Sequence, residues 1–283
     1  MNIKEHYKKA TSEETRFYEE ILYPLQDRIF TFVSVYDDKI YLTGGTALSR
    51  FFFRHRFSDD LDFFTTTDDL KLIANDLIAR LHDKGYGVNT TNLDIYFART
   101  FIEKDNVQLK IEFVKEYNRF GKSLHTEKGI FINNLEDMGA NKITAFEERV
   151  EVKDIIDLYY ITKTISLERL FEIADRKRIP VPYEELLTLN TEGISGRALV
   201  CQDIDLCDIK HFLQNLKEET ERQIKKKEEI ALNNINKIAE RMLWDFPRYE
   251  RNFNKFSQPV LKRRLKTLPL PERRAIERIV CDE

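Results

Sequence analysis

The amino-acid sequence predicts an α+β protein in which a small mixed sheet with helices is followed by a helical half. Short apolar runs that end in glycine or other turn residues alternate with helical patterns up to about residue 134. After that point the apolar residues recur only at helical spacing. The sequence has neither an internal repeat nor a low-complexity segment. We therefore expect two domains, residues 1–134 and residues 135–283.

The first expected element is an N-terminal helix. Thr11 and Glu14 have the spacing of a capping box, in which each side chain bonds to the backbone of the other residue. Pro24 lies within the helical pattern and is expected to kink it. The apolar face of this helix consists of Phe17, Ile21, Leu25, Ile29 and Phe32.

Strands and helices then alternate. Thr67 or Asp68 is expected to cap a helix whose apolar face runs from Leu70 to Leu81, and Gly85 is expected to end it. The rest of the first half predicts a strand over 39–45, a helix over 46–53 and a second strand over 57–64. A hairpin that turns at 104–106 is expected over 87–116, and a short strand over 129–133. The second half predicts helices over 135–150, 152–165, 166–178 and 206–242.

Composition limits the classes of function. The hydrophobic content of 42% and the charged content of 34% are typical of a folded protein and argue against disorder. A net charge of −3 gives no global attraction to nucleic acid or anionic membrane, so a polyanion site must be a local patch. The three cysteines are too few and too irregularly spaced for a disulfide framework or a zinc site. Without a signal-peptide pattern or a membrane-spanning apolar run, we expect a cytoplasmic protein with no membrane partner.

Two adjacent glycines form the first candidate feature of a site. Gly44 and Gly45 end a predicted strand, and a helix is expected to begin at Thr46. Glycine tolerates positive φ and lets another group approach the backbone closely. A helix start presents free N–H groups and the positive end of the helix dipole to an anion. These three residues are candidates for phosphate binding, and a tight strand-to-helix turn without a ligand is the alternative.

Carboxylates form the second candidate feature. In a strand Asp60 and Asp62 project from one face with Cα atoms about 6–7 Å apart, so their carboxylates can converge on shared cations. The strand expected over 107–113 alternates in the same way, with Glu112 on one face and a buried face that consists of Val107, Leu109, Ile111 and Phe113. Glu112 would join the aspartates if this strand lay beside theirs. Oxygen ligands of this kind favour Mg²⁺ or Mn²⁺ over zinc. A sheet edge joined by ion pairs, without metal, is the alternative, and the available cations are Lys110, Arg50, Arg54 and Arg56.

Both features together resemble a known family. Residues 43–64, TGGTALSRFFFRHRFSDDLDFF, are similar to the first motif of the AbiEii/AbiGii abortive-infection toxin family of the nucleotidyltransferase superfamily. That motif is a Gly-Gly-Thr turn followed by an Arg, a Ser and an Asp-x-Asp pair. Residues 140–161, ANKITAFEERVEVKDIIDLYYI, resemble its later motif through Lys142, Arg149, Lys153, Asp154 and Asp157. The resemblance covers roughly residues 15–160.

The resemblance implies a polymerase-β-like nucleotidyltransferase core. Two Mg²⁺ ions, or Mn²⁺, would be held by Asp60, Asp62 and Glu112, although the third acidic residue of such folds is more often Asp. An acceptor hydroxyl would attack the α-phosphate of an NTP, and pyrophosphate would leave. Asp154 would position Lys142 or act as a base. The nucleotide-binding residues implied are Gly44, Gly45, Thr46, Arg56, Ser58, Lys142 and Asp157.

The acceptor is less well defined by the sequence. Residues 255–278 are locally basic, as a phosphate-backbone site requires, but solvated helices explain this composition equally well. Relatives of this fold in toxin–antitoxin pairs modify tRNA 3′ ends. The resemblance therefore implies an RNA acceptor and a cognate DNA-binding antitoxin, in a type IV-like toxin–antitoxin or abortive-infection system. The alternatives are transfer to a small molecule or a protein, and a module that binds nucleotide or a partner without turnover.

The remaining polar residues suggest nothing more specific. His55 and His125 show no ligand spacing and are expected at the surface or at caps. Lys153 and Asp157 are spaced for an i,i+4 ion pair on a helix surface.

Overall fold

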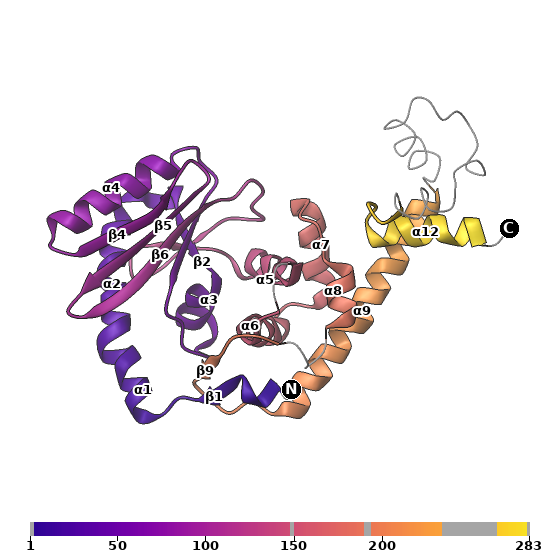
Figure 1. Cartoon of the computed structure of the whole chain (residues 1–283), viewed down its shortest axis with the longest axis horizontal. Coiled ribbons are helices and arrows are strands. Elements are labelled where there is room, and N and C mark those ends of the chain that lie inside the picture. The colour runs from indigo at the N-terminus through magenta and orange to yellow at the C-terminus, as the bar shows by residue number, and fades with distance from the viewer. Residues whose placement is uncertain (1–2, 148–149, 190–193, 234–264, 282–283) are drawn as a thin grey trace. The chain divides into compact units, whose positions relative to one another are not determined.

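The computed structural model describes residues 3–147, 150–189, 194–233 and 265–281 (Figure 1). Contacts divide the chain into two compact units. The first comprises Met1–Val181 with Asn190–Phe212, and the second comprises Pro182–Leu189 with Leu213–Glu283. The boundary expected after residue 134 lies inside the first unit. Buried ion pairs explain this, since Lys177, on a helix beyond that boundary, lies 2.7 Å from Glu116, which follows a strand of the sheet.

A seven-stranded mixed sheet forms the centre of the first unit, in the order β4–β5–β6–β3–β2–β8–β7. Strands β6 and β3 are parallel, as are β2 and β8, and the other neighbours are antiparallel. The strands, in chain order from β2 to β8, are Tyr41–Thr43, Leu61–Thr65, Gly87–Leu93, Phe97–Lys104, Val107–Lys115, Leu124–His125 and Phe131–Ile132. The prediction of an α+β fold with a small mixed sheet is confirmed.

The segment 87–116, predicted as one hairpin, forms the three-stranded meander β4–β5–β6. Its second turn lies at Asp105 and Asn106, where φ is 54° and 60°, within the predicted range. The first turn was not predicted. Asp94 stabilises it by accepting the backbone N–H groups of Tyr96 and Phe97 at 2.7 and 2.8 Å.

The N-terminal helical segment has three parts: α1 (Ser12–Phe17), a π-helical turn (Tyr18–Leu22) and α2 (Tyr23–Val33). The capping box is confirmed: Glu14 N donates to Thr11 Oγ1 at 3.2 Å, and Thr11 N donates to Glu14 Oε2 at 2.9 Å. The predicted buried face is wrong in its first turns, where Phe17 and Ile21 are exposed and their neighbours Tyr18 and Leu22 are buried. Pro24 has no N–H to bond the carbonyl four residues back, and the wider π turn before it rotates the buried face by one residue.

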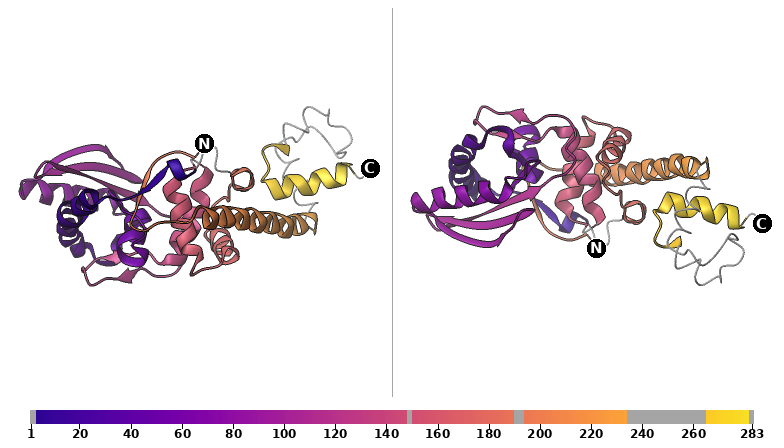
Figure 2. Two further views of the ribbon diagram at one scale, coloured as in Figure 1. Left: turned by 90° about the horizontal axis from the view of Figure 1, so that it is seen from below. Right: turned by 90° about the horizontal axis from the view of Figure 1, so that it is seen from above.

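Helices α2 and α4 (Leu70–Asp83) pack against each other on one face of the sheet (Figures 1 and 2). The apolar face of α4 is buried as predicted, and Gly85, with φ of +74°, ends the helix. The predicted cap is wrong: Asp69 precedes the helix without a side-chain cap. Thr67 instead accepts the N–H of Asp69 at 3.4 Å, and Asp68 pairs with Lys115 at 2.8 Å.

Three helices complete the first unit: α5 (Leu135–Thr144), α6 (Val152–Thr162) and α7 (Leu167–Lys177). All three were predicted, although α5 ends before the predicted residue 150. The sequence analysis missed a parallel strand pair, β1 (Tyr7–Lys9) with β9 (Ala198–Val200). The shorter helical elements of this unit are Ile3–Glu5, Ser34–Lys39, α3 (Gly44–Ala47), the π-helical turn Leu48–Phe53, and Ala145–Glu147.

The second unit is helical. It contains α8 (Tyr183–Thr188), most of α9 (Leu206–Asn233) and α12 (Leu270–Cys281). A small core joins Ala231 of α9 to Ala275 and Ile276 of α12. The predicted extension of the long helix to Met242, and the part of the basic stretch over 255–264, lie outside the described residues.

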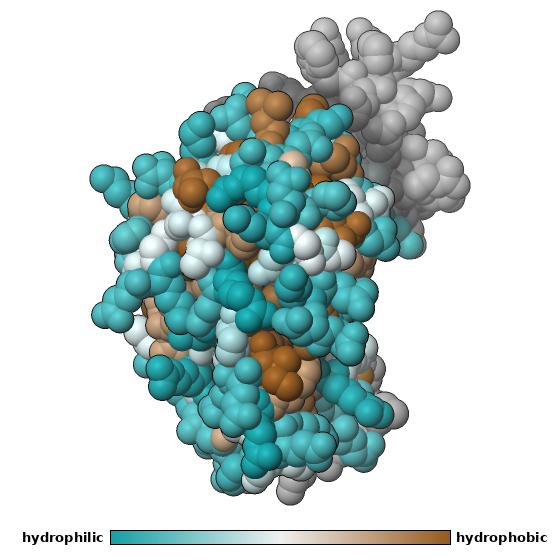
Figure 3. All heavy atoms as spheres, turned by 90° about the vertical axis from the view of Figure 1, so that its left-hand side faces the viewer, coloured by the Kyte–Doolittle hydropathy of each residue, from teal (hydrophilic) through white to brown (hydrophobic). Residues whose placement is uncertain are grey.

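The surface of the face that carries α4 is hydrophilic over most of its area, with small separate hydrophobic patches (Figure 3). This distribution agrees with the charged content of 34%. Within the described ranges, no helix combines the length and the apolar character that crossing a bilayer requires.

Candidate active site

A cavity of about 450 Å³ lies where the end of β2 meets the starts of β3 and α6. Its walls come from segments that are far apart in the chain, between Tyr18 and Leu199. Nine of the sequence-predicted residues line it: Gly44, Gly45, Arg56, Ser58, Asp60, Asp62, Glu112, Lys142 and Asp154. The structure therefore brings both sequence motifs to one place.

Two predicted nucleotide-binding residues, Thr46 and Asp157, do not line the cavity and are buried behind it. The Thr46 hydroxyl donates to the carbonyl oxygen of Asp60, and its oxygen lies 2.9 Å from Ser58 Oγ. Thr46 thus ties the start of the helix to the segment that leads into β3, and it orients Ser58 rather than facing the cavity.

The glycines make room for two charged side chains. The helix α3 begins at Gly44, two residues earlier than predicted, and Gly44 has φ of +67°. A Cβ at Gly44 would lie 2.7 Å from Asp62 Oδ2, and a Cβ at Gly45 would collide with the Arg56 guanidinium. Both glycines are needed because side chains of the site lie against the backbone.

Substitution of Gly45 tests this close approach. Gly45→Ala is expected to lower the free energy of unfolding by about 1–3 kcal/mol, because Arg56 is buried and cannot swing away. Urea denaturation of the two proteins measures the change. Gly87→Ala is the matched control, since its Cβ would meet Glu103 Cβ at an ordinary 3.4 Å. Equal stability of Gly45→Ala and the wild type would show that the Arg56 side chain can move away from a methyl group at this position.

The three carboxylates lie on neighbouring strands. β3 begins at Leu61, later than predicted, and Asp60 immediately precedes it. β3 runs parallel to β6 with Asp62 directly beside Glu112. The sequence-based placement of Glu112 beside the aspartates is therefore confirmed. The buried face of β6 is also as predicted, with Leu109, Ile111 and Phe113 in the core.

Charge accumulates at these carboxylates. Burial, together with the charges of Glu112 and Asp60, raises the pKa of Asp62 to about 6. Two cations offset part of this charge: Lys110 Nζ lies 2.9 Å from Asp60 and 3.4 Å from Glu112, and Arg99 Nε lies 2.5 Å from Glu112. Burial would raise the pKa of Glu112, but Arg99 and Lys110 outweigh it and lower that pKa.

An all-oxygen set of three carboxylates in adjacent positions has the chemistry that Mg²⁺ or Mn²⁺ requires. As the side chains stand, no three acidic, histidine or cysteine residues of the described part of the chain converge closely enough to hold an ion. The three carboxylates fit a divalent cation in chemical type and in strand register, and as placed they pair with Lys110 and Arg99. The assignment of Asp60, Asp62 and Glu112 as metal ligands stays a prediction.

A buried ion cluster supports the opposite wall of the cavity. Asp157, fully buried on α6, accepts two bonds from the Arg56 guanidinium at 2.6 and 2.7 Å. Lys142 Nζ lies 2.6 Å from Asp154 and 2.8 Å from Asp157. Burial would raise the pKa of Asp157, but Arg56 and Lys142 hold it well below its usual range. The cluster joins the first sequence motif to the later one.

Two of the expected roles are wrong. His55 is buried, not exposed, and its Nε2–H donates to Asp157 Oδ1 at 2.7 Å. Burial lowers the pKa of His55, so the ring is neutral near pH 7 although Asp157 opposes this effect. Lys153 pairs with Glu151 at 2.9 Å rather than with Asp157, because Asp157 turns inward to Arg56. Arg149 lies outside the described residues.

The cavity also contains residues that the sequence analysis did not select. Arg197 lies in its wall because the segment at β9 runs beside residues 55–57. There Phe57 N donates to Leu199 O at 2.8 Å, and Cys201 N donates to His55 O at 2.9 Å. Arg197 belongs to no motif and lies far from the others in sequence, so no local pattern could have found it.

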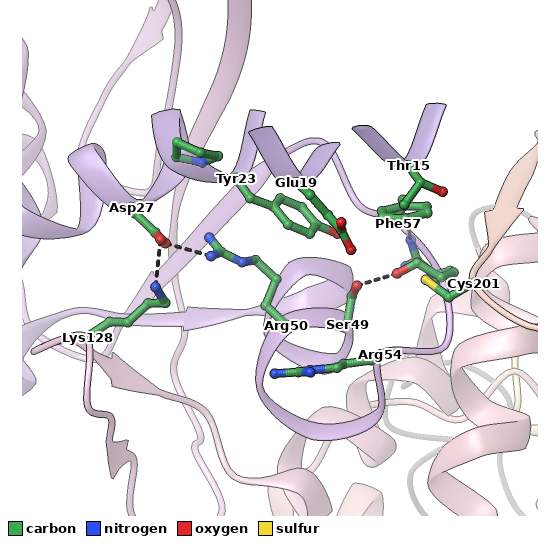
Figure 4. Close-up of a pocket in the computed structure, with 12 residues that line it drawn as sticks. Thr15, Glu19, Tyr23, Asp27, Ser49, Arg50, Arg54, Phe57, Lys128 and Cys201 are labelled. Atoms are coloured by element: carbon green, nitrogen blue, oxygen red, sulfur yellow. Dashed lines mark hydrogen bonds and ion pairs between the residues drawn. The ribbon is translucent and has the colours of Figure 1, made fainter. Parts of the chain in front are cut away.

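A second cavity of about 580 Å³ lies on the other side of Arg56 and Phe57 (Figure 4). Asp27 forms ion pairs there with Arg50 and with Lys128, both at 2.6 Å. Arg50 also stacks on the ring of Tyr23, with 4.6 Å from Cζ to the centroid. The first cavity is the stronger candidate for an active site, because it brings together residues of both sequence motifs and three neighbouring carboxylates.

Comparison with known proteins shows which sequences and folds this chain resembles. A curated protein of Aquifex aeolicus (strain VF5), described only as uncharacterized, is 29% identical over 175 residues, which are 58% of this chain and 79% of that protein. The crystal structure of JHP933 from Helicobacter pylori has a TM-score of 0.50 at 22% identity and covers 77% of this chain and 98% of its own. MenT4, a nucleotidyltransferase toxin from Mycobacterium tuberculosis, has a TM-score of 0.52 at 16% identity. The match covers 71% of this chain and 86% of the MenT4 chain.

These two structures share the fold. The sequence model of one family, described as "Nucleotidyl transferase AbiEii toxin, Type IV TA system", matches residues 30–223. The match includes every carboxylate of the cavity and both sequence motifs. Since it spans well over half of the 283 residues, the chain belongs to the AbiEii nucleotidyl transferase toxin family.

Proposed function

We propose that this protein transfers a nucleoside monophosphate from an NTP to an acceptor hydroxyl in the cavity bounded by Gly44 and Asp62. The observation that carries the proposal is the register of β3 and β6, which places Asp62 beside Glu112 and next to Asp60. Three neighbouring carboxylates are costly to hold together without cations, since like charges repel. Since the chain belongs to a nucleotidyl transferase family, we propose this cluster as the metal site.

Asp60, Asp62 and Glu112 would hold two divalent ions, Mg²⁺ or Mn²⁺. Ions bound there would activate the acceptor hydroxyl and neutralise charge on the transferred phosphate and on the leaving pyrophosphate. Because Gly44 and Gly45 have no side chain, Asp62 and Arg56 can lie against the backbone at the wall of the cavity. Ser58 lines the cavity and is held by Thr46, whose Oγ1 lies 2.9 Å from Ser58 Oγ, so its hydroxyl is a candidate contact for a phosphate oxygen.

The basic wall of the cavity would bind the triphosphate. Lys142 is held by Asp154 at 2.6 Å, which favours Asp154 as a positioning residue over its alternative role as a base. Arg56 is held by Asp157 and presents its guanidinium to the cavity edge at Gly45. Arg197 and Lys153 add positive charge to the same wall. Asp157 would act on the nucleotide only through Arg56 and Lys142.

RNA, at a tRNA 3′ end, is the acceptor that we propose, with a cognate antitoxin as the protein partner and the cytoplasm as the location. The support is the family itself, whose description is that of a type IV toxin–antitoxin toxin. A small-molecule or protein acceptor uses the same chemistry in the same cavity. A module that binds nucleotide without turnover is disfavoured by the intact pair of Asp60 and Asp62.

Transfer of label from an NTP tests the proposal. The purified protein is incubated with each α-labelled NTP, Mg²⁺, total RNA and cell extract, beside an Asp60→Ala/Asp62→Ala variant. We expect label on RNA with the wild type and none with the variant. Label on protein or on a metabolite would identify a different acceptor. Absence of label with all four NTPs, in a sample shown to be folded, would contradict catalysis and favour the binding module.

A further inference from the structure

Lys110 lies between two of the carboxylates that would hold the metal. It is on β6, two residues before Glu112, so both side chains project from the same face of the strand. Its ammonium is 2.9 Å from Asp60 Oδ2 and 3.4 Å from Glu112 Oε2. A single cation thus bridges two carboxylates from different strands, as a divalent ion would.

Lys110 and a metal ion therefore compete for the same oxygens. The Lys110 side chain is only 27% exposed and that of Glu112 only 14%, so water screens their attraction incompletely. Arg99 holds the other oxygen of Glu112 at 2.5 Å, which leaves this carboxylate fully engaged. As they are placed, the acidic, histidine and cysteine side chains of the described ranges form no group able to hold an ion.

We propose that Lys110 is a built-in counterion that keeps free divalent metal out of the site, so that the metal enters together with the nucleotide. The inference rests on the proposed function. When a metal–nucleotide complex binds, the carboxylates exchange Lys110 for the metal, and the released ammonium pairs with a phosphate oxygen of the nucleotide. In this exchange the carboxylates and the Lys110 ammonium each keep a partner of opposite charge. Binding of free metal would instead leave Lys110 partly buried without its anions.

Removal of the Lys110 ammonium tests both parts of the proposal: the exclusion of free metal and the contact with a phosphate of the nucleotide. Lys110→Met keeps the length of the aliphatic stem and removes the charge, and Lys110→Gln is a second variant of the same kind. Lys115→Met is the matched control, because Lys115 lies on the same strand but pairs with Asp68, whose side chain is fully exposed. Each protein is used as the full chain, and its thermal unfolding is compared with that of the wild type.

Binding of Mn²⁺ is measured by the electron paramagnetic resonance signal of the free ion, with and without a non-hydrolysable NTP analogue. Without nucleotide, Lys110→Met is expected to bind Mn²⁺ at least about tenfold more tightly than the wild type, and Lys115→Met is expected to bind like the wild type. The Mn²⁺–analogue complex is expected to bind Lys110→Met less tightly than the wild type, since a phosphate contact is lost.

The opposite results overturn the inference. If Lys110→Met and Lys110→Gln bind free Mn²⁺ no more tightly than the wild type, Lys110 is not the group that excludes the ion. The same conclusion follows if none of these proteins binds Mn²⁺ at all, since removal of the ammonium should have opened the site. An Asp60→Asn/Asp62→Asn variant that binds Mn²⁺ like the wild type in the presence of the nucleotide analogue would instead contradict the metal site of the proposed function.

Discussion

Asp62→Asn is expected to lower nucleotidyl transfer by about 10²–10³-fold while the protein keeps its fold. The asparagine has the same shape and fits against Gly44, but it lacks the charge that a shared cation requires. Removing one of three crowded carboxylates also relieves repulsion with Glu112 and Asp60, so stability should not fall. Initial rates with the NTP and the acceptor that the labelling experiment identifies measure the loss, and thermal unfolding checks the fold.

Asp59→Asn is the control for this measurement. Asp59 lines the same cavity, but its carboxylate accepts the Tyr18 hydroxyl at 2.6 Å and does not face Glu112. We expect its loss of activity to be much smaller than that of Asp62→Asn. Equal effects of the two substitutions would mean that the cavity needs general negative charge rather than a carboxylate at Asp62.

The second large effect is expected at Asp157. Asp157→Asn should lower the free energy of unfolding by about 3–5 kcal/mol, because two buried cations, Arg56 and Lys142, lose the carboxylate that they share. Urea denaturation at neutral pH measures the change. Asp203→Asn is the matched control, since Asp203 pairs with Lys9 at 2.8 Å with its side chain 81% exposed, and such pairs contribute about 0–1 kcal/mol.

The pH dependence of stability gives an independent check on Asp157. Its pKa in the folded protein lies well below the value of about 3.9 expected in the unfolded chain. Its stabilisation is therefore complete above that unfolded value and is lost as the pH falls through the folded pKa. The difference in stability between the wild type and Asp157→Asn should shrink in strong acid. A difference that stays constant down to low pH would show that packing, not charge, stabilises this position.

Local patterns in the sequence predicted much of the fold. The capping box of Thr11 and Glu14 and the ending of α4 at Gly85 depend on residues close in sequence, and both are confirmed. The alternation of β6 predicted its buried face and thus the side on which Glu112 projects. The predicted buried face of the N-terminal helix was wrong by one residue in its first turns, because a regular helical period does not include the π turn before Pro24.

The candidate site shows the same division between local and distant information. The sequence by itself determined the glycine turn, the aspartate pair and the later motif, because each is a spacing within one segment. Only the tertiary structure decided the partners of the charges. His55 and Arg56 are neighbours in sequence, and they are buried with Asp157, 101 residues beyond Arg56, because both pair with Asp157 there. Lys110 bridges Asp60 and Glu112, and Arg197 joins the cavity, through contacts between strands. Ion pairing depends on distance in space, which a linear pattern does not contain.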